Sequence, residues 1–429
     1  MPRPPKKFRP LPFDYHEELE VTVDSLSNLG VGIARVNLAK IAGAEISESE
    51  EDGRALHSSE SEGWVVFVPF CLPGERVRAR IYRNDKNCSH ADLVEVLEAS
   101  PDRVEPQCRL FGQCGGCQYQ HLSYERQLEW KSQQVAELLT HMAGIDHEVL
   151  PAIPSPREWH YRSKITPHFQ KPRNGKIETI GFLAQGTRSR TIELDQCPIA
   201  MEEINKALPR EKQRIRESAS RFKKGATLLL RAAASGVHTN PHDVVEERVG
   251  DLTFRFLAGD FFQNNPAILP AFTGHVAEEA AVGCDYLVDA YCGSGLFTLS
   301  LANRFQEVAG IEVAMTSADW ARQNARENGF ENVTIHTASA EHIFDEITFP
   351  ADCTAVVIDP PRKGCGPEFL EQLFRFGPKR VVYVSCNPAT QIRDLHSFHD
   401  HGYQLEKVQP FDLFPQTRHL ECVATLSRS

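Results

Sequence analysis

A cysteine, Cys386, stands at the end of the apolar run RVVYV and is followed by Asn-Pro. The run predicts a buried strand, and the proline stiffens the loop that leaves it. A cysteine fixed at a strand's carboxyl end suits nucleophilic attack, provided that its thiol is accessible and partly ionised. Cys386 is therefore the predicted nucleophile. Cys292, Cys353 and Cys422 lie within apolar runs and are predicted to be structural.

A carboxylate, Glu421, stands in the segment HLECVATL near the C-terminus. Apolar residues follow it, so we expect a strand that draws Glu421 into the sheet region. A partly desolvated carboxyl group has a raised pKa and acts as a base near neutrality. A surface glutamate on an edge strand would give the same pattern, so this segment alone leaves both interpretations open.

The segment DAYCGSGL, residues 289–296, follows an apolar run and opens a predicted helix. Its two glycines allow a sharp turn and the close approach of a ligand, and the helix N-terminus offers free N–H groups. About 20 residues on, Glu312 ends the next strand, where a carboxylate accepts hydrogen bonds from ribose hydroxyls. A tight turn between strand and helix would also contain glycines. Together with Glu312, however, the segment predicts an adenosine-type cofactor.

Asp359 follows the apolar run TAVVI and precedes two prolines. The prolines force an extended, stiff exit from the strand, which fixes the aspartate without mobile backbone. A simple strand terminator gives the same pattern, so a functional role for Asp359 is favoured only in combination with the other motifs.

Four cysteines of the middle region form a possible metal-ligand set: Cys108, Cys114, Cys117 and Cys197. Four soft thiolates with one close CxxC pair suit an iron–sulfur cluster or zinc. Zinc ribbons usually contain two CxxC pairs, so the triplet with one distant cysteine favours iron–sulfur. Free buried cysteines are the remaining alternative.

Three regions must position these residues. Short strands with Gly and Pro turns over residues 14–100 predict a small β-barrel, interrupted by an acidic insertion at 40–62 that we expect to be disordered. Residues 101–250 are a mixture of helix-like and strand-like pieces. Residues 251–429 alternate apolar strands with amphipathic helices, which predicts an α/β fold with a doubly wound parallel sheet and ligands at the carboxyl ends of its strands.

Charge and composition limit the possible functions. The formal net charge is −11, but the acidic insertion contributes much of it, and basic residues gather elsewhere, as in the segment 210–224. Arg76, Arg78 and Arg80 alternate along one predicted strand, so their shared face is either solvated or in contact with nucleic acid. No apolar run is long enough to span a membrane and no secretory signal is evident, so we expect a cytoplasmic protein.

The ordered set CGGC, FFQNN, DAYCGSGLF, DPPRKG, SCNP and HLE resembles the RNA 5-methyluridine methyltransferase family over nearly the whole chain. The predicted barrel resembles that family's TRAM domain, an RNA-binding module. The resemblance implies S-adenosylmethionine as cofactor and RNA as partner, and no obligate protein partner is inferred. Asp-Pro-Pro sequences line the methyl-acceptor pocket of many enzymes that use this cofactor.

The resemblance also implies roles for individual residues. Cys386 corresponds to the nucleophile that adds to carbon 6 of uracil, and Glu421 to the base that removes the proton from carbon 5. The residues that correspond to cofactor contacts are Gln263, Tyr291, Glu312 and Asp359. The residues that correspond to ligands of a [4Fe-4S] cluster are Cys108, Cys114, Cys117 and Cys197. Some bacterial members carry Asn where this chain has Leu296, and a position near Ser339 contacts the cofactor in some members.

Three functions remain open from the sequence. The TRAM-like barrel and the cysteine set favour methylation of a uridine in 23S rRNA. Methylation of a tRNA uridine by the same mechanism is the alternative, and fungal tRNA enzymes with similar DAYCGSGLF segments keep it open. A non-catalytic RNA-binding protein is the third, and the presence of both Cys386 and Glu421 argues against it.

Overall fold

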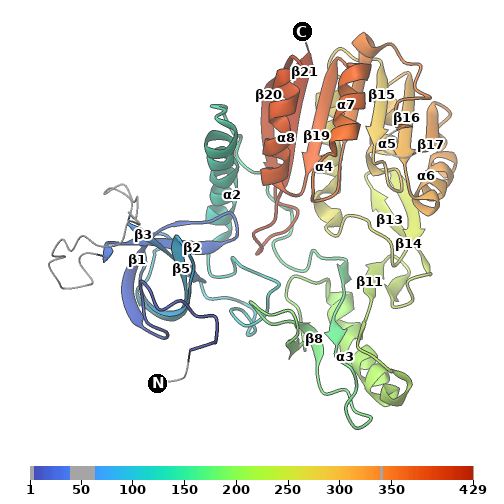
Figure 1. The fold of residues 1–429 in the computed structure, drawn as a ribbon. Coiled ribbons are helices and arrows are strands. Elements are labelled where there is room, and N and C mark those ends of the chain that lie inside the picture. The colour runs from blue at the N-terminus through green and yellow to red at the C-terminus, as the bar shows by residue number, and fades with distance from the viewer. Residues whose placement is uncertain (1–3, 39–62, 339–341, 429) are drawn as a thin grey trace. The chain divides into compact units, whose positions relative to one another are not determined.

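The computed structural model describes residues 4–38, 63–338 and 342–428, and it divides into two compact units (Figure 1). The first unit comprises Met1–Gly112 and Cys117–Arg126, and the second comprises Gln113–Gly116 and Gln127–Ser429.

Two features expected from the sequence lie outside the described residues: the acidic insertion at 40–62 and Ser339. The division into domains at 14–100, 101–250 and 251–429 stays a prediction. None of the described helices is long and apolar enough to cross a membrane.

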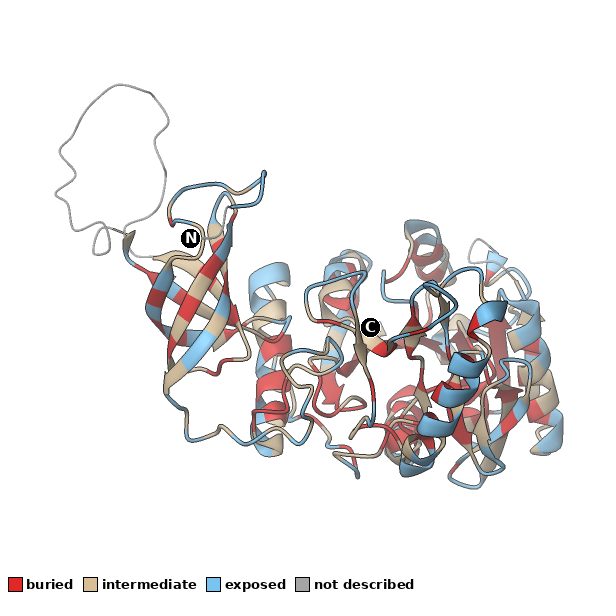
Figure 2. Ribbon diagram, turned by 90° about the horizontal axis from the view of Figure 1, so that it is seen from below, coloured by how far each residue is buried: buried red, intermediate tan, exposed pale blue. Residues whose placement is uncertain are grey.

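Five strands of the first unit form a closed barrel in the order β1-β2-β3-β5-β4, which confirms the predicted β-barrel. Buried and exposed side chains alternate along its strands, as the two-residue period of a strand requires (Figure 2). The aliphatic side chains of the buried positions fill the barrel interior. The strands are β1 (Glu18–Leu26), β2 (Val31–Val36), β3 (Trp64–Pro69), β4 (Arg76–Asn84) and β5 (Cys88–Glu98).

Short strands and helices follow the barrel in sequence. The helices are α2 (Tyr124–Leu138), the π-helical turn η1 (Leu139–Ala143), α3 (Glu202–Glu217) and the 3₁₀ turn η2 (Ala219–Arg221). One small sheet has the order β10-β7-β8-β9, a second has the order β12-β11-β6, and β13 and β14 form a hairpin. The strands are β6 (Lys164–Ile165), β7 (His168–Phe169), β8 (Ile180–Leu183), β9 (Thr191–Glu193), β10 (Ala226–Thr227), β11 (Leu230–Ala233), β12 (Gly236–His238), β13 (Val244–Val249) and β14 (Leu252–Leu257).

A seven-stranded sheet with the order β17-β16-β15-β18-β19-β21-β20 forms the rest of the second unit (Figure 1). The first five strands in this order are parallel, and β21 and β20 are antiparallel to their neighbours. This arrangement confirms the predicted doubly wound fold. The strands are β15 (Tyr286–Ala290), β16 (Glu307–Glu312), β17 (Val333–Thr337), β18 (Thr354–Ile358), β19 (Arg380–Ser385), β20 (Tyr403–Phe411) and β21 (Glu421–Arg428).

Helices cover both faces of this sheet, so its central strands are apolar on both sides. Phe272 and Phe297 from α4 and α5 belong to one core cluster, and Phe369 and Phe398 from α7 and α8 belong to the other. The helices are α4 (Leu269–Ala280), α5 (Leu296–Leu301), α6 (Met315–Glu327), α7 (Pro367–Phe376) and α8 (Pro388–Asp400), with 3₁₀ turns η3 (Pro266–Ile268), η4 (Ala302–Arg304) and η6 (Ala351–Cys353).

Candidate active site

Three predicted cofactor residues form a row across the sheet. Ala290 of β15 pairs with Ile311 of β16 on one side and with Ile358 of β18 on the other. The next residues along these strands are Tyr291, Glu312 and Asp359, so parallel register places them at one level. The strand order reverses between β15 and β18, which is where doubly wound folds bind ligands.

The turn after β15 is fixed by Glu312. One oxygen of its carboxylate accepts a hydrogen bond from the Gly293 N–H at 3.0 Å, and the other accepts one from the Ala314 N–H at 2.8 Å. Gly293 and Gly295 have φ values of 56° and 94°, and Tyr291 adopts φ 68° although it has a side chain. Glycine enters this region without steric cost, whereas the tyrosine is held there by its surroundings.

Asp289 stabilises the same turn through hydrogen bonds with Thr298. Its Oδ2 accepts hydrogen bonds from the Thr298 N–H at 2.8 Å and from the Thr298 hydroxyl at 2.5 Å. Its Oδ1 has no hydrogen-bond partner within the described part of the chain. Burial raises the pKa of Asp289 to about 7, and the nearby Glu312 contributes to the increase.

The predicted nucleophile and base lie opposite each other. In the antiparallel pair of β19 and β21, Ser385 pairs with Cys422. One step further, Cys386 therefore faces Glu421. Cys386 is partly exposed, whereas Glu421 is 3% exposed, and its Oε2 has no hydrogen-bond partner among the residues that the structure describes. The surface-glutamate interpretation of Glu421 is therefore wrong.

The segment before Glu421 is anchored at several points. The buried Lys131 Nζ lies 2.6 Å from Asp412 Oδ1. The Leu413 carbonyl accepts a hydrogen bond from Asn265 Nδ2 at 3.1 Å, and the Gln416 N–H donates to the side chain of Gln127 at 3.0 Å. These contacts fix the start of β21.

Arg362, which sequence reasoning passed over, joins the two halves of the site. Its carbonyl accepts hydrogen bonds from Asn387 Nδ2 at 3.0 Å and from the Thr390 hydroxyl at 3.2 Å, which ties the Asp-Pro-Pro-Arg loop to the loop of Cys386. Its guanidinium lowers the pKa of the Cys386 thiol. The available signal was its position directly after Asp-Pro-Pro in the sequence.

The pKa values of this group are strongly perturbed. Burial raises the pKa of the Cys386 thiol to about 11, and Glu421 and Asp359 add to the increase, whereas Arg362 opposes it. Burial, followed by the charge of Asp359, raises the pKa of Glu421 well above its ordinary value. Burial and Asp289 raise the pKa of Asp359 to about 7. Without substrate, the thiol is therefore protonated near neutral pH, and its proton must leave before the sulfur attacks.

Gln263 lies on a separate loop of the second unit. Its side chain is 5% exposed and makes no hydrogen bond among the described residues. The neighbouring Asn264 carbonyl accepts a hydrogen bond from the Ser163 N–H at 2.8 Å, which holds the loop. Phe261, two positions before Gln263, is 74% exposed, a conspicuous aromatic that sequence reasoning also missed.

The four predicted cluster ligands divide between the two units. Cys108 and Cys117 belong to the first unit and Cys114 and Cys197 to the second, so the complete set stays a prediction. Within the second unit, Cys114 and Cys197 lie close enough for the charge of one to influence the other. The Gly115 N–H donates to the Leu183 carbonyl at 3.0 Å, which fixes the backbone beside Cys114.

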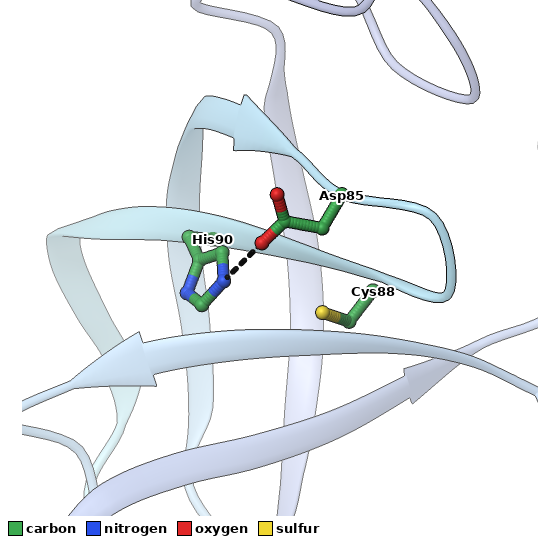
Figure 3. A group of neighbouring side chains, drawn as sticks. All are labelled: Asp85, Cys88 and His90. Carbon is green, nitrogen blue, oxygen red and sulfur yellow. Dashed lines mark hydrogen bonds and ion pairs between the residues drawn. The ribbon is translucent and has the colours of Figure 1, made fainter.

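One further group of potential metal ligands occurs on the barrel, at the turn between β4 and β5 (Figure 3). Asp85 Oδ2 lies 3.1 Å from His90 Nε2, and Cys88 lies beside them. Arg83 Nη2 lies 2.8 Å from the other carboxylate oxygen of Asp85. Because Arg83 already neutralises the carboxylate, ion pairing accounts for this group.

The arginines of β4 are paired with acids on neighbouring strands. Arg76 lies 2.8 Å from both Glu20 and Glu98, and Arg78 lies 2.9 Å from Glu95. Arg80 lies 3.5 Å from Asp92. These pairs favour the solvated interpretation of this strand face over direct contact with nucleic acid.

Comparisons with known proteins match this arrangement. The family model described as tRNA (Uracil-5-)-methyltransferase matches residues 227–429, and the model of the TRAM domain matches residues 16–94. A Schizosaccharomyces pombe tRNA (uracil(54)-C(5))-methyltransferase is 39% identical over 443 residues, which cover 97% of this chain and 80% of that protein. The Saccharomyces cerevisiae protein of the same description is 31% identical over 497 residues, which cover 98% of this chain and 75% of that protein.

A solved structure has the same fold. It is the Pyrococcus abyssi tRNA (uracil-54, C5)-methyltransferase in complex with S-adenosyl-L-homocysteine, with a TM-score of 0.69 and 23% sequence identity. The match covers 95% of this chain and 99% of that one. The likeness extends over both units of the chain.

Proposed function

The chain belongs to the RNA 5-methyluridine methyltransferase family, and from this premise we propose that its substrate is uridine 54 of tRNA. It is an S-adenosylmethionine-dependent enzyme that methylates carbon 5 of uracil in RNA. The observation that carries the choice of tRNA is the similarity to two fungal tRNA enzymes over 97% and 98% of this chain. The sequence-based preference for 23S rRNA gains no such support.

The test is methyl transfer to purified RNAs. With labelled S-adenosylmethionine, we expect the enzyme to methylate a tRNA transcript at position 54 and to leave the same transcript with cytidine 54 unlabelled. Fragments of 23S rRNA serve as the competing substrate. Efficient labelling of rRNA and none of tRNA would reverse the assignment.

The residues of the site fit S-adenosylmethionine. Glu312 ends β16 and Asp359 follows β18, the two parallel strands that flank β15 at the reversal of strand order. Carboxylates at this edge can meet ribose hydroxyls and a cationic sulfonium. When bound, the cofactor supplies an electrophilic methyl group. Tyr291 and Gln263 complete the proposed set of contacts.

We assign the covalent chemistry to Cys386 and Glu421. The Cys386 thiolate adds to carbon 6 of uracil, and the electron pair of the 5,6 double bond moves to form an enolate. Carbon 5 then takes the methyl group. Glu421 removes the proton from carbon 5, and the electrons of that C–H bond reform the double bond and expel the Cys386 thiolate. Arg362 stabilises the thiolate at the start and the end of this cycle.

The target base must leave its stack to reach both residues, at a cost on the order of a few kcal/mol. Contacts with RNA phosphates elsewhere on the enzyme offset this cost. We propose that Phe261, whose side chain is exposed two positions before Gln263, offers an aromatic surface to an unstacked base.

We further propose that Cys108, Cys114, Cys117 and Cys197 hold a [4Fe-4S] cluster. The proximity of Cys114 and Cys197 in the second unit supports half of this set. Four thiolates are the usual ligands of such a cluster. No catalytic step is assigned to it.

Anaerobically purified protein should contain iron and acid-labile sulfide, and Cys197→Ser should lower both together with the yield of soluble protein. The control is Cys353→Ser, because Cys353 is partly exposed and lies outside this set. Stoichiometric zinc without iron in the unsubstituted protein would contradict the cluster.

A further inference from the structure

Exposed cations are frequent on the small sheet β10-β7-β8-β9 and the segments that connect its strands, and five of them lie beside Gln170 or the residues that it contacts. They are Lys171, Arg188, Arg190, Lys223 and Lys224. None of their side chains makes an ion pair or a hydrogen bond within the described part of the chain. We call them the Gln170 surface, after the residue at which their segments meet.

The geometry around Gln170 brings three segments together. Ala226 of β10 pairs with Phe169 of β7, which places Gly225 opposite Gln170. A Cβ atom on Gly225 would lie 2.5 Å from the Phe169 carbonyl, so only glycine permits this approach. The Gln170 side chain donates a hydrogen bond to the Ser189 carbonyl at 3.0 Å.

These contacts determine where the cations lie. Lys171 follows Gln170, Arg188 and Arg190 flank Ser189, and Lys223 and Lys224 precede Gly225. Phe222 packs edge-on against Phe169 with the ring centroids 4.9 Å apart, which anchors the segment that contains Lys223 and Lys224. Five cationic residues from three separate segments thus directly follow, flank or precede residues that meet at Gln170.

Acidic neighbours do not neutralise this cluster. Glu193 of β9 is engaged by Lys212 and by Arg216, the latter at 2.7 Å. Glu178, which faces Lys171 across the β7–β8 turn, is the one nearby acid with a carboxylate unpaired among the described residues. The arginines on the described barrel strands, in contrast, are paired with acids. Unpaired like charges repel one another, and a polyanion relieves that repulsion.

We propose that the Gln170 surface binds the phosphate backbone of the RNA substrate at a point other than the reacting uridine. This inference rests on the proposed function, since it takes RNA as the substrate. Lysine and arginine contacts with phosphates are independent of base sequence, so the surface contributes affinity and not choice of nucleotide. The chain's net charge of −11 makes such a local concentration of cations necessary for binding a polyanion.

The test compares two triple variants of the full chain that lose the same charge. The first is Arg188→Gln with Lys223→Gln and Lys224→Gln. The control is Lys206→Gln with Arg214→Gln and Arg375→Gln, because these exposed cations are paired with Glu202, Glu211 and Glu371. RNA binding is measured by fluorescence anisotropy as a function of salt, and methylation by initial rates.

The first triple variant should bind tRNA roughly tenfold or more weakly near 0.1 M salt. The slope of its plot of log affinity against log salt concentration should be smaller in magnitude by about 2 to 3. Its KM for tRNA should rise while kcat at saturating RNA and thermal unfolding stay unchanged. The control variant should change much less. Equal binding by the two variants would overturn the proposal.

The outcomes separate this inference from the proposed function. If the unsubstituted enzyme binds tRNA through these residues but does not methylate it, the substrate assignment fails and the surface stands. If it methylates tRNA and the two variants behave alike, only the surface fails.

Discussion

Glu421→Gln should convert the enzyme into a trap for its own RNA substrate. Cys386 would still add to carbon 6 and carbon 5 would still accept the methyl group, but no carboxylate would remove the proton from carbon 5. The covalent protein–RNA adduct should therefore accumulate as a slowly migrating band on a denaturing gel. Turnover should fall by a factor on the order of 10⁴, as with other essential catalytic groups.

Cys386→Ala is the matched control for this experiment. It removes the sulfur that forms the adduct, so both the band and the methylation should disappear. Adding the double variant Cys386→Ala with Glu421→Gln tests whether the band depends on Cys386 alone. A band that persists without Cys386, or its absence in Glu421→Gln, would show that the two roles are assigned incorrectly.

Arg362→Gln should raise the pKa of Cys386 above its value of about 11, because the substitution removes a positive charge that lowers it. Below the pKa, the thiolate fraction rises about tenfold for each pH unit. A further increase of about one unit would therefore lower the thiolate fraction, and the rate of methylation, about tenfold at any pH below 11. Arg362→Lys retains the charge and should recover part of the loss.

Alkylation of Cys386 by iodoacetamide measures this effect without RNA. The rate, followed by mass spectrometry of the Cys386 peptide, should rise with pH in the unsubstituted enzyme, and the curve should shift to higher pH in Arg362→Gln. The Cys353 thiol provides the internal reference, since Arg362 is not among the groups that shift its pKa. Superimposable curves for Cys386 would mean that Arg362 does not stabilise its thiolate.

The sheet was predictable because its central strands are buried on both faces and so read as unbroken apolar runs, such as TAVVI and RVVYV. α7, at Pro367–Phe376, is one of the amphipathic helices that the alternation of strands and helices predicts. α8 was missed because the Asn-Pro after Cys386 was interpreted as a stiff loop. Proline is favoured in the first turn of a helix, and Pro388 occupies that position.

The site was only partly predictable, because its geometry depends on long-range pairing. Cys386 and Glu421 were each identified from local sequence. That they face each other, however, depends on the antiparallel register of β21 beside β19. Cys353 was predicted to be structural from the apolar run beside it, and it ends a 3₁₀ turn just before β18, where it is partly exposed. The pairing of the β4 arginines likewise depends on acids contributed by β1 and β5.

The register of β21 also determines where related chains can change length. Successive side chains of a strand point to opposite faces, so a one-residue shift of β21 would turn Glu421 away from Cys386. A single insertion or deletion within the anchored segment 412–420 is therefore expected to be eliminated by selection. In β20, by contrast, the irregularity between Leu405 and Lys407 already accommodates an extra residue without moving Glu421 from its pairing with Phe411. Length variation during evolution should accordingly be found before this point of β20 and be absent between Phe411 and Glu421.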